Sequence, residues 1–125
     1  MASLPAAFAA NSTSRDLRIL ARELLKLRTE RSRHFPFDVT GPAWDLLLAL
    51  FHVGESQEQL SLGDLVDRTN VPRTTAVRWL REMKRHGLVT LGSDRHDKRL
   101  VRVAITALGI ETMDNLLGQT ELSTE

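Results

Sequence analysis

The sequence contains no cysteine, and this absence excludes several kinds of chemistry. Without a thiol the chain cannot form disulfides, hold a metal through thiolates, use a cysteine nucleophile or carry a cysteine redox switch. No apolar run approaches the roughly 18 residues that a membrane-spanning helix needs. The N-terminal stretch MASLPAAFAA begins without a basic residue and matches a signal peptide poorly. We therefore expect a cytoplasmic protein that makes no contact with a membrane.

Patterns typical of active sites are missing as well. The sequence has no G-x-S-x-G, no glycine-rich phosphate loop and no paired-carboxylate pattern. The histidines are scattered and show no metal-ligand spacing such as H-x-x-x-H: His34, His52, His86 and His96. We therefore expect no enzyme, no cofactor and no metal site.

The chain also has little excess of charge of either sign. Its 17 Lys and Arg against 16 Asp and Glu leave a net charge of +1, whereas domains that bind nucleic acid are usually visibly basic. The distribution of charge is uneven, because residues 72–102 hold nine Lys or Arg and only three Asp or Glu. The rest of the chain holds eight bases and thirteen acids. A basic segment beside an acidic remainder provides the polarity that a nucleic-acid binder needs.

The segment 14–33 is predicted to form an amphipathic helix. Its leucines recur every three or four residues, a seam of about two heptads, at Leu17, Leu20, Leu24 and Leu27. The opposite positions are mostly basic. Two interpretations remain open: the seam packs on the chain's own core, or it forms half of a homodimer interface.

The remaining elements follow the order of a winged helix. We expect helices near 42–51, 62–68, 73–86 and 107–118, and strands at 88–91 and 100–105. Asn70 is suited to the turn before the third of these helices, and Gly87 to its end. The 125 residues, 42% hydrophobic, suffice for one domain. The predicted fold is mainly α (α+β): a tail over 1–13, a single domain over 14–120 with its winged-helix core at 41–109 and a two-stranded β-hairpin wing, and a tail over 119–125.

The helix predicted over 73–86 has one apolar and one polar face. Ala76, Leu80 and Met83 fall within a narrow arc on a helical wheel. The polar positions lie opposite that arc or at the N-terminal end: Arg73, Thr74, Thr75, Arg78, Arg81 and Arg85. Guanidinium and hydroxyl groups in this arrangement can contact base edges and phosphates in the major groove. A merely solvated basic face is the alternative.

The turn between the two predicted strands supports the DNA-binding interpretation. It contains the basic residues Arg95, Lys98 and Arg99, and a basic β-turn beside a recognition helix can follow phosphates or enter the minor groove. Asp97 is an acid among these bases. We expect it to orient a neighbouring arginine through a charge-assisted hydrogen bond.

The stretch from about Leu60 to Gly109 resembles the winged-helix core of the MarR family of bacterial transcription regulators. The matching pieces are VPRTTAVRWLREMKRHGLV, DRHDKR and VAITALG. The resemblance implies that Arg99 reaches the minor groove and that Asp97 helps to hold it. It also implies that the polar start of the recognition helix reads the DNA, from Pro72, Arg73, Thr74 and Thr75 to Arg78 one turn later.

The sequence departs from the family pattern in two places. Pro72 stands where the family commonly has a serine that caps the helix. Family members continue beyond the wing into two long helices that build the dimer, whereas this sequence has 16 residues after Gly109. The resemblance therefore implies a short variant of the family, in which the helix over 14–33 is the candidate for the dimer contact.

The function expected from these features is sequence-specific binding of double-stranded DNA by a homodimeric transcription regulator, associated with the bacterial nucleoid. The candidate DNA-binding residues are Arg73, Thr74, Thr75, Arg78, Arg81, Lys84, Arg85, Arg95, Lys98, Arg99 and Arg102. The main alternative is a winged-helix module that binds an acidic protein. A ligand-responsive regulator would need an apolar pocket near Phe35, Phe37 and Trp44, but these aromatics are better explained as core residues. A small-molecule effector stays open, without support from the sequence.

Overall fold

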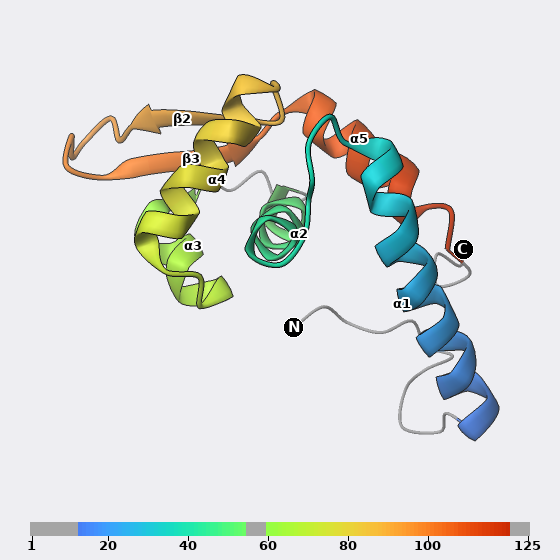
Figure 1. Ribbon diagram of the computed structural model, residues 1–125. Coiled ribbons are helices and arrows are strands. Elements are labelled where there is room, and N and C mark those ends of the chain that lie inside the picture. Colours follow the sequence, from blue (N-terminus) through green and yellow to red (C-terminus); the bar gives the residue numbers. More distant parts are fainter. Residues whose placement is uncertain (1–12, 55–59, 121–125) are drawn as a thin grey trace. The chain divides into compact units, whose positions relative to one another are not determined.

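The computed structural model describes residues 13–54 and 60–120, which fall into two compact units (Figure 1). The larger unit, residues 39–111, contains the predicted core. The smaller one is formed by residues up to 38 together with those from 112 onward. The elements are α1 (Ser14–His34), α2 (Pro42–Gly54), β1 (Leu60–Ser61), α3 (Leu62–Thr69), α4 (Arg73–Arg85), β2 (Val89–Ser93), β3 (Val101–Ile105) and α5 (Ala107–Leu117).

Helix α2 is the centre of the larger unit. Its sequence is apolar on most sides, as a helix surrounded by protein requires. Leu46, Leu47 and Leu50 are buried, and α2 packs against α3, α4 and β3. Burial of side chains of this size stabilises the unit by about 1.5–3 kcal/mol each. The winged-helix core predicted from periodicity is confirmed by this packing.

The sheet has three strands rather than the two that the sequence predicts. Its order is β1-β3-β2, and all pairs are antiparallel. The additional strand β1 is the pair Leu60–Ser61, which lies opposite Val103 and Arg102 of β3. Two residues are too few to show an alternating pattern, so this strand is formed by pairing alone. Strand β2 also ends two residues later than predicted, at Ser93.

Local caps and turns set the boundaries of α3 and α4. The Ser61 hydroxyl accepts a hydrogen bond from the backbone N–H of Asp64 at 3.0 Å, and Asn70 ends α3 in the left-handed conformation with φ 57°. Pro72 precedes α4 without a side-chain cap. Gly87 follows α4 with φ 77°, a conformation that glycine adopts at little cost. The predicted turn chemistry of the helix-turn-helix is confirmed at both ends.

A tight junction joins the end of α4 to the start of α5. The Thr106 hydroxyl donates to the Gly87 carbonyl at 2.6 Å and accepts from the Gly109 N–H at 3.0 Å. A Cβ at Gly109 would lie only 2.4 Å from the Leu88 carbonyl oxygen. The run ITALG therefore has a physical basis: threonine caps α5, and glycine allows the helix to approach the backbone that follows α4.

The smaller unit contains α1 and the C-terminal half of α5. Thr13 and Asp16 form a reciprocal capping box at the start of α1, with distances of 3.0 and 3.1 Å. Met113 and Leu116 of α5 are fully buried. Phe35 is buried and lies 6.3 Å from Phe37 between ring centres. Residues 1–12 and 121–125, most of the two predicted tails, lie outside the described residues, as do residues 55–59.

The predicted leucine seam of α1 is unevenly buried. Leu20 and Leu27 are half-buried, whereas Leu17 and Leu24 are 51% and 54% exposed. Leu25, outside the seam, is also exposed. The buried residue of α1 is instead Glu23, which accepts a hydrogen bond from Arg22 at 3.4 Å. Among the described residues, Leu17 and Leu24 are therefore the exposed half of the seam.

Candidate nucleic-acid interface

The polar face of α4 is exposed along its whole length. Ala76, Leu80 and Met83 are fully buried and fix the helix on its scaffold. The side chains opposite that arc are exposed to solvent, at Thr74, Arg78, Arg81 and Arg85. Arg73 and Lys84, beside the arc, are also exposed, while Thr75 is half-buried at the helix start. The predicted division of this helix into an inner and an outer face is confirmed.

Two contacts restrict cations of α4. The guanidinium carbon of Arg78 lies 5.5 Å from the centre of the Trp79 ring, a cation–π distance. Near the C-terminal end, Glu82 lies 3.8 Å from Arg85 and 3.1 Å from His86 Nε2. Exposed ion pairs of this kind contribute little to stability. Arg85 therefore stays available for another partner, and Arg78 is partly ordered by the indole.

The hairpin of β2 and β3 belongs to the same unit as α4, and β2 packs against that helix (Figure 1). The loop between its strands, residues 94–100, carries the predicted basic residues. Arg95, Lys98 and Arg99 are all exposed. The basic wing and α4 thus belong to one compact unit, although residues 86–93 lie between them in the sequence.

Asp97 and Arg99 form a bidentate ion pair at the tip of the wing. Arg99 donates from Nε and Nη2 to the two carboxylate oxygens at 3.0 and 3.1 Å, and its backbone N–H donates to Oδ1 at 3.0 Å. These bonds lower the pKa of the Asp97 carboxyl. The Arg99 side chain remains 90% exposed. The structure therefore contains the pair that the sequence predicts, with the guanidinium oriented and accessible.

A second carboxylate, Asp94, was missed by the sequence reasoning. Its Oδ1 accepts from the N–H groups of His96 and Asp97 at 2.8 and 2.9 Å, and its Oδ2 accepts from Arg102 Nε at 2.5 Å. An Asp that bonds backbone groups two and three residues later is the usual signal of an Asx turn, so half of this role could have been read from the sequence. The partner Arg102, eight positions away, could not.

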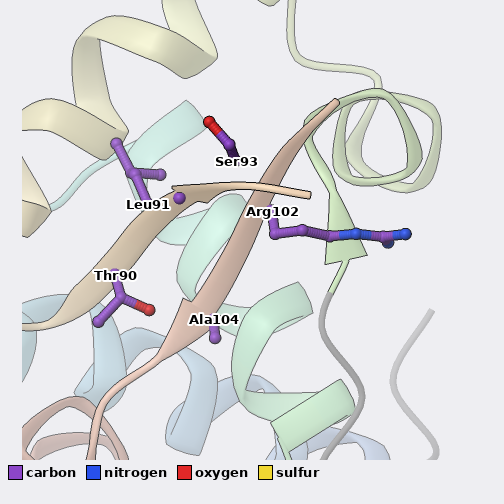
Figure 2. A pocket seen from close by; sticks show the side chains of 6 residues that line it. Thr90, Leu91, Ser93, Arg102 and Ala104 are labelled. Carbon is purple, nitrogen blue, oxygen red and sulfur yellow. The ribbon is translucent and has the colours of Figure 1, made fainter. Parts of the chain in front are cut away.

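The outer face of the hairpin is hollowed beside Arg102 (Figure 2). The hollow measures about 170 Å³ and is lined by Thr90, Leu91, Gly92, Ser93, Arg102 and Ala104. Gly92 lies opposite Arg102 in the register of the two strands. In Figure 2 the Arg102 side chain points away from those of Leu91 and Ser93. Arg102 is thus held at the base of the wing rather than at its tip.

Two other kinds of site were sought in the described part of the chain. No helix there is both long and apolar enough to cross a membrane. Within 13–54 and 60–120, no three His, Asp or Glu side chains are grouped in a way that could hold a metal ion.

Known structures share this fold. The S. aureus MepR–DNA complex is 21% identical to this chain with a TM-score of 0.65, over 84% of this chain and 82% of the other. YusO from Bacillus subtilis is 14% identical with a TM-score of 0.64, over 82% and 67%. A MarR-family transcriptional regulator from Silicibacter pomeroyi is 26% identical with a TM-score of 0.59, over 81% and 63%.

Sequence comparison gives the family directly. A search of curated proteins found no match. The sequence pattern of the MarR family, in contrast, matches residues 37–100, more than half of the chain. This range contains α2, the helix-turn-helix and the wing tip with its Asp97–Arg99 pair. The chain belongs to the MarR family and has its winged-helix fold.

Proposed function

We propose that this chain is a transcription regulator that binds double-stranded DNA in a sequence-specific manner. One observation carries the proposal: an exposed row of cations and hydroxyls on α4 and an oriented, exposed Arg99 on the wing belong to one compact unit. A recognition helix in the major groove and a basic loop at the adjacent minor groove require this combination. Family membership supports the same assignment.

The roles within α4 follow from position and chemistry. Thr74, Thr75 and Arg78 lie in the first two turns, the part of a recognition helix that contacts base edges. Arginine at such a position donates two hydrogen bonds to guanine O6 and N7, and threonine contacts a thymine methyl or a phosphate. Arg81, one turn later, contacts a base edge or positions the helix in the major groove. Lys84 and Arg85 neutralise phosphates, because they lie at the far end of the helix.

The wing contributes affinity and a minor-groove contact. Arg99 enters the minor groove with its guanidinium already held by Asp97, which reduces the conformational entropy lost on binding. Arg95 and Lys98 flank it and contact phosphates. Minor-groove arginines of this kind respond to groove width and so to A·T content.

A homodimer completes the proposal. The exposed leucines Leu17 and Leu24 lie one heptad apart on α1, and burial of such a row against a second copy is the simplest way to remove it from water. A two-fold axis would then place two recognition helices about 34 Å apart, one turn of DNA. The operator would be palindromic.

Selection of bound duplexes from a random pool tests the proposal, followed by a titration of the selected duplex at several salt concentrations. We expect a palindromic sequence and a log affinity that falls with log salt, with a slope of about −0.9 per neutralised phosphate. A scrambled duplex of the same length and composition is the control. Absence of binding to any duplex at low salt would contradict the proposal and favour an interaction module for acidic proteins.

A further inference from the structure

We propose that Asp94 is the positioning residue of the wing: it closes the loop and holds Arg102 on the sheet, so that the cations of the tip, and not Arg102, face the DNA. This inference rests on the proposed function and refines it. It assigns a role to a carboxylate whose negative charge is unfavourable beside DNA. It also removes Arg102 from the candidate phosphate contacts.

The geometry around Asp94 has two parts. Oδ1 accepts from two successive backbone N–H groups, those of His96 and Asp97. The Asp94 N–H donates to the Leu100 carbonyl at 2.9 Å, and the Leu100 N–H donates to the Asp97 carbonyl at 3.0 Å. The carboxylate therefore closes the first half of the loop while backbone bonds close the second. Asp97, whose carboxylate holds Arg99, is fixed by both halves.

Oδ2 has a separate partner, the Nε of Arg102 on the central strand. The Arg102 and Asp94 side chains are 33% and 11% exposed, in contrast to 90% for the Arg99 side chain of the other pair. Charge-assisted bonds in partly desolvated surroundings are stronger than those at an open surface. The bond from Nε to Asp94 anchors the Arg102 side chain to the sheet, whereas Arg99 projects into solvent beside Asp97.

The ionised form of Asp94 is the one that accepts these hydrogen bonds. Arg102, His96 and Asp97 all donate to it, and these bonds lower the pKa of its carboxyl, with Arg102 as the largest cause. Asp94 is therefore charged at neutral pH. A negative charge near DNA weakens binding on electrostatic grounds alone. Removal of the Asp94 charge would therefore tighten binding if repulsion were its main effect, and weaken binding if positioning is.

The test compares D94A, D94N and R102Q with the wild-type chain on the selected duplex. Removal of the carboxylate in D94A should weaken binding by a factor of about three to ten, because the loop must then be ordered on binding. D94N keeps an oxygen at Oδ1 and should recover part of this loss. Amide hydrogen exchange at His96 and Asp97 should accelerate in D94A and less in D94N, while amides of α2 stay protected.

The salt dependence separates positioning from direct contact. R102Q should leave the slope of log affinity against log salt unchanged, while the matched control K98Q should reduce it by about 0.9. Tighter binding by D94A than by the wild type, or a reduced slope for R102Q, would overturn the role of Asp94 and leave the proposed function intact. A wild-type chain that binds no duplex would overturn the proposed function itself.

Discussion

At the scale of single residues, the wing separates two tasks between two Asp–Arg pairs. Asp97 orients Arg99, which is fully accessible, while Asp94 holds Arg102, which is not. The four residues lie within nine positions of one another in the sequence. Their charges alone do not distinguish them. Exposure and backbone geometry do, because they leave Arg99 open to solvent and hold Arg102 on the sheet.

Arg99 is the residue whose loss we expect to matter most for the minor groove. Arg99→Ala should weaken binding to the selected duplex by about 1–3 kcal/mol, the usual value of a specific, desolvated arginine contact. Fluorescence anisotropy at fixed salt measures this. Arg33→Ala, an exposed arginine of α1, is the matched control. An R99A variant with the affinity of the wild type would exclude the assigned contact.

Three carboxylates make the stability of the fold depend on pH in the acidic range. Asp16, Asp94 and Asp97 all have a lowered pKa in the folded chain because each accepts hydrogen bonds. A lowered folded-state pKa adds stability above the unfolded value near 3.9, and this is lost as pH falls through the folded value. The free energy of unfolding should therefore fall as the pH drops below about 4.

Urea unfolding at a series of pH values between neutral and 2.5 measures this loss. The double variant D94N/D97N should show a flatter acid limb than the wild type, because two of the three carboxylates are gone. An identical dependence on pH in the two proteins would rule out these groups as its source.

At the scale of elements, the junction between α4 and α5 fixes the recognition helix in its unit. The Thr106 hydroxyl connects α5 to the Gly87 carbonyl through one hydrogen bond and caps the helix by accepting from the Gly109 N–H, and Gly109 lies close to the Leu88 carbonyl oxygen. The Thr106 N–H adds a bond to the Leu88 carbonyl at 2.9 Å. These contacts explain physically why a threonine and a glycine occur at this spacing after β3.

Gly109→Ala tests this junction. The added methyl would lie 2.4 Å from a backbone oxygen and 2.7 Å from Ile105, so the helix must shift, at a cost of about 1–3 kcal/mol. Thermal and urea unfolding measure the change. Gly92→Ala is the matched control, because its Cβ would meet nothing within 4 Å. Equal stability of G109A and the wild type would show that the junction adapts.

At the scale of the whole molecule, the near-zero net charge conceals a division of charge. The segment 72–102 carries a surplus of six positive charges, and the structure places its helix and its wing in one unit. The remainder is acidic. Solubility follows the total, whereas attraction to a phosphate backbone follows the local charge. The sequence therefore reveals this division of charge only when the charges are counted segment by segment.

The oligomeric state is the second property of the whole molecule. Leu17→Glu with Leu24→Glu should convert a dimer into a monomer in sedimentation equilibrium, because two like charges would replace the centre of an apolar seam. Binding to the palindromic duplex should weaken in parallel. Leu25→Glu is the control, since Leu25 is even more exposed, at 63%, but lies outside the seam. A wild-type monomer would refute the proposed dimer.

The sequence by itself determined the order of the elements and the positions of most boundaries. Helical and alternating periods gave the five helices and the hairpin, because each period is imposed by local backbone geometry. Asn70 and Gly87 marked turns because few residues adopt a positive φ at low cost. The outer face of α4 and the Asp97–Arg99 pair could also be predicted from the sequence, because the residues of each are close together in the chain.

Only the tertiary structure decided the contacts between distant residues. Strand β1 exists because Leu60 and Ser61 lie beside β3, about forty residues later, and two residues carry no period of their own. Arg102 pairs with Asp94 because the antiparallel hairpin brings β3 back beside the end of β2. The exposure of Leu17 and Leu24 likewise emerges only after packing. Local patterns determine local conformation, whereas pairing and burial depend on what the fold brings together.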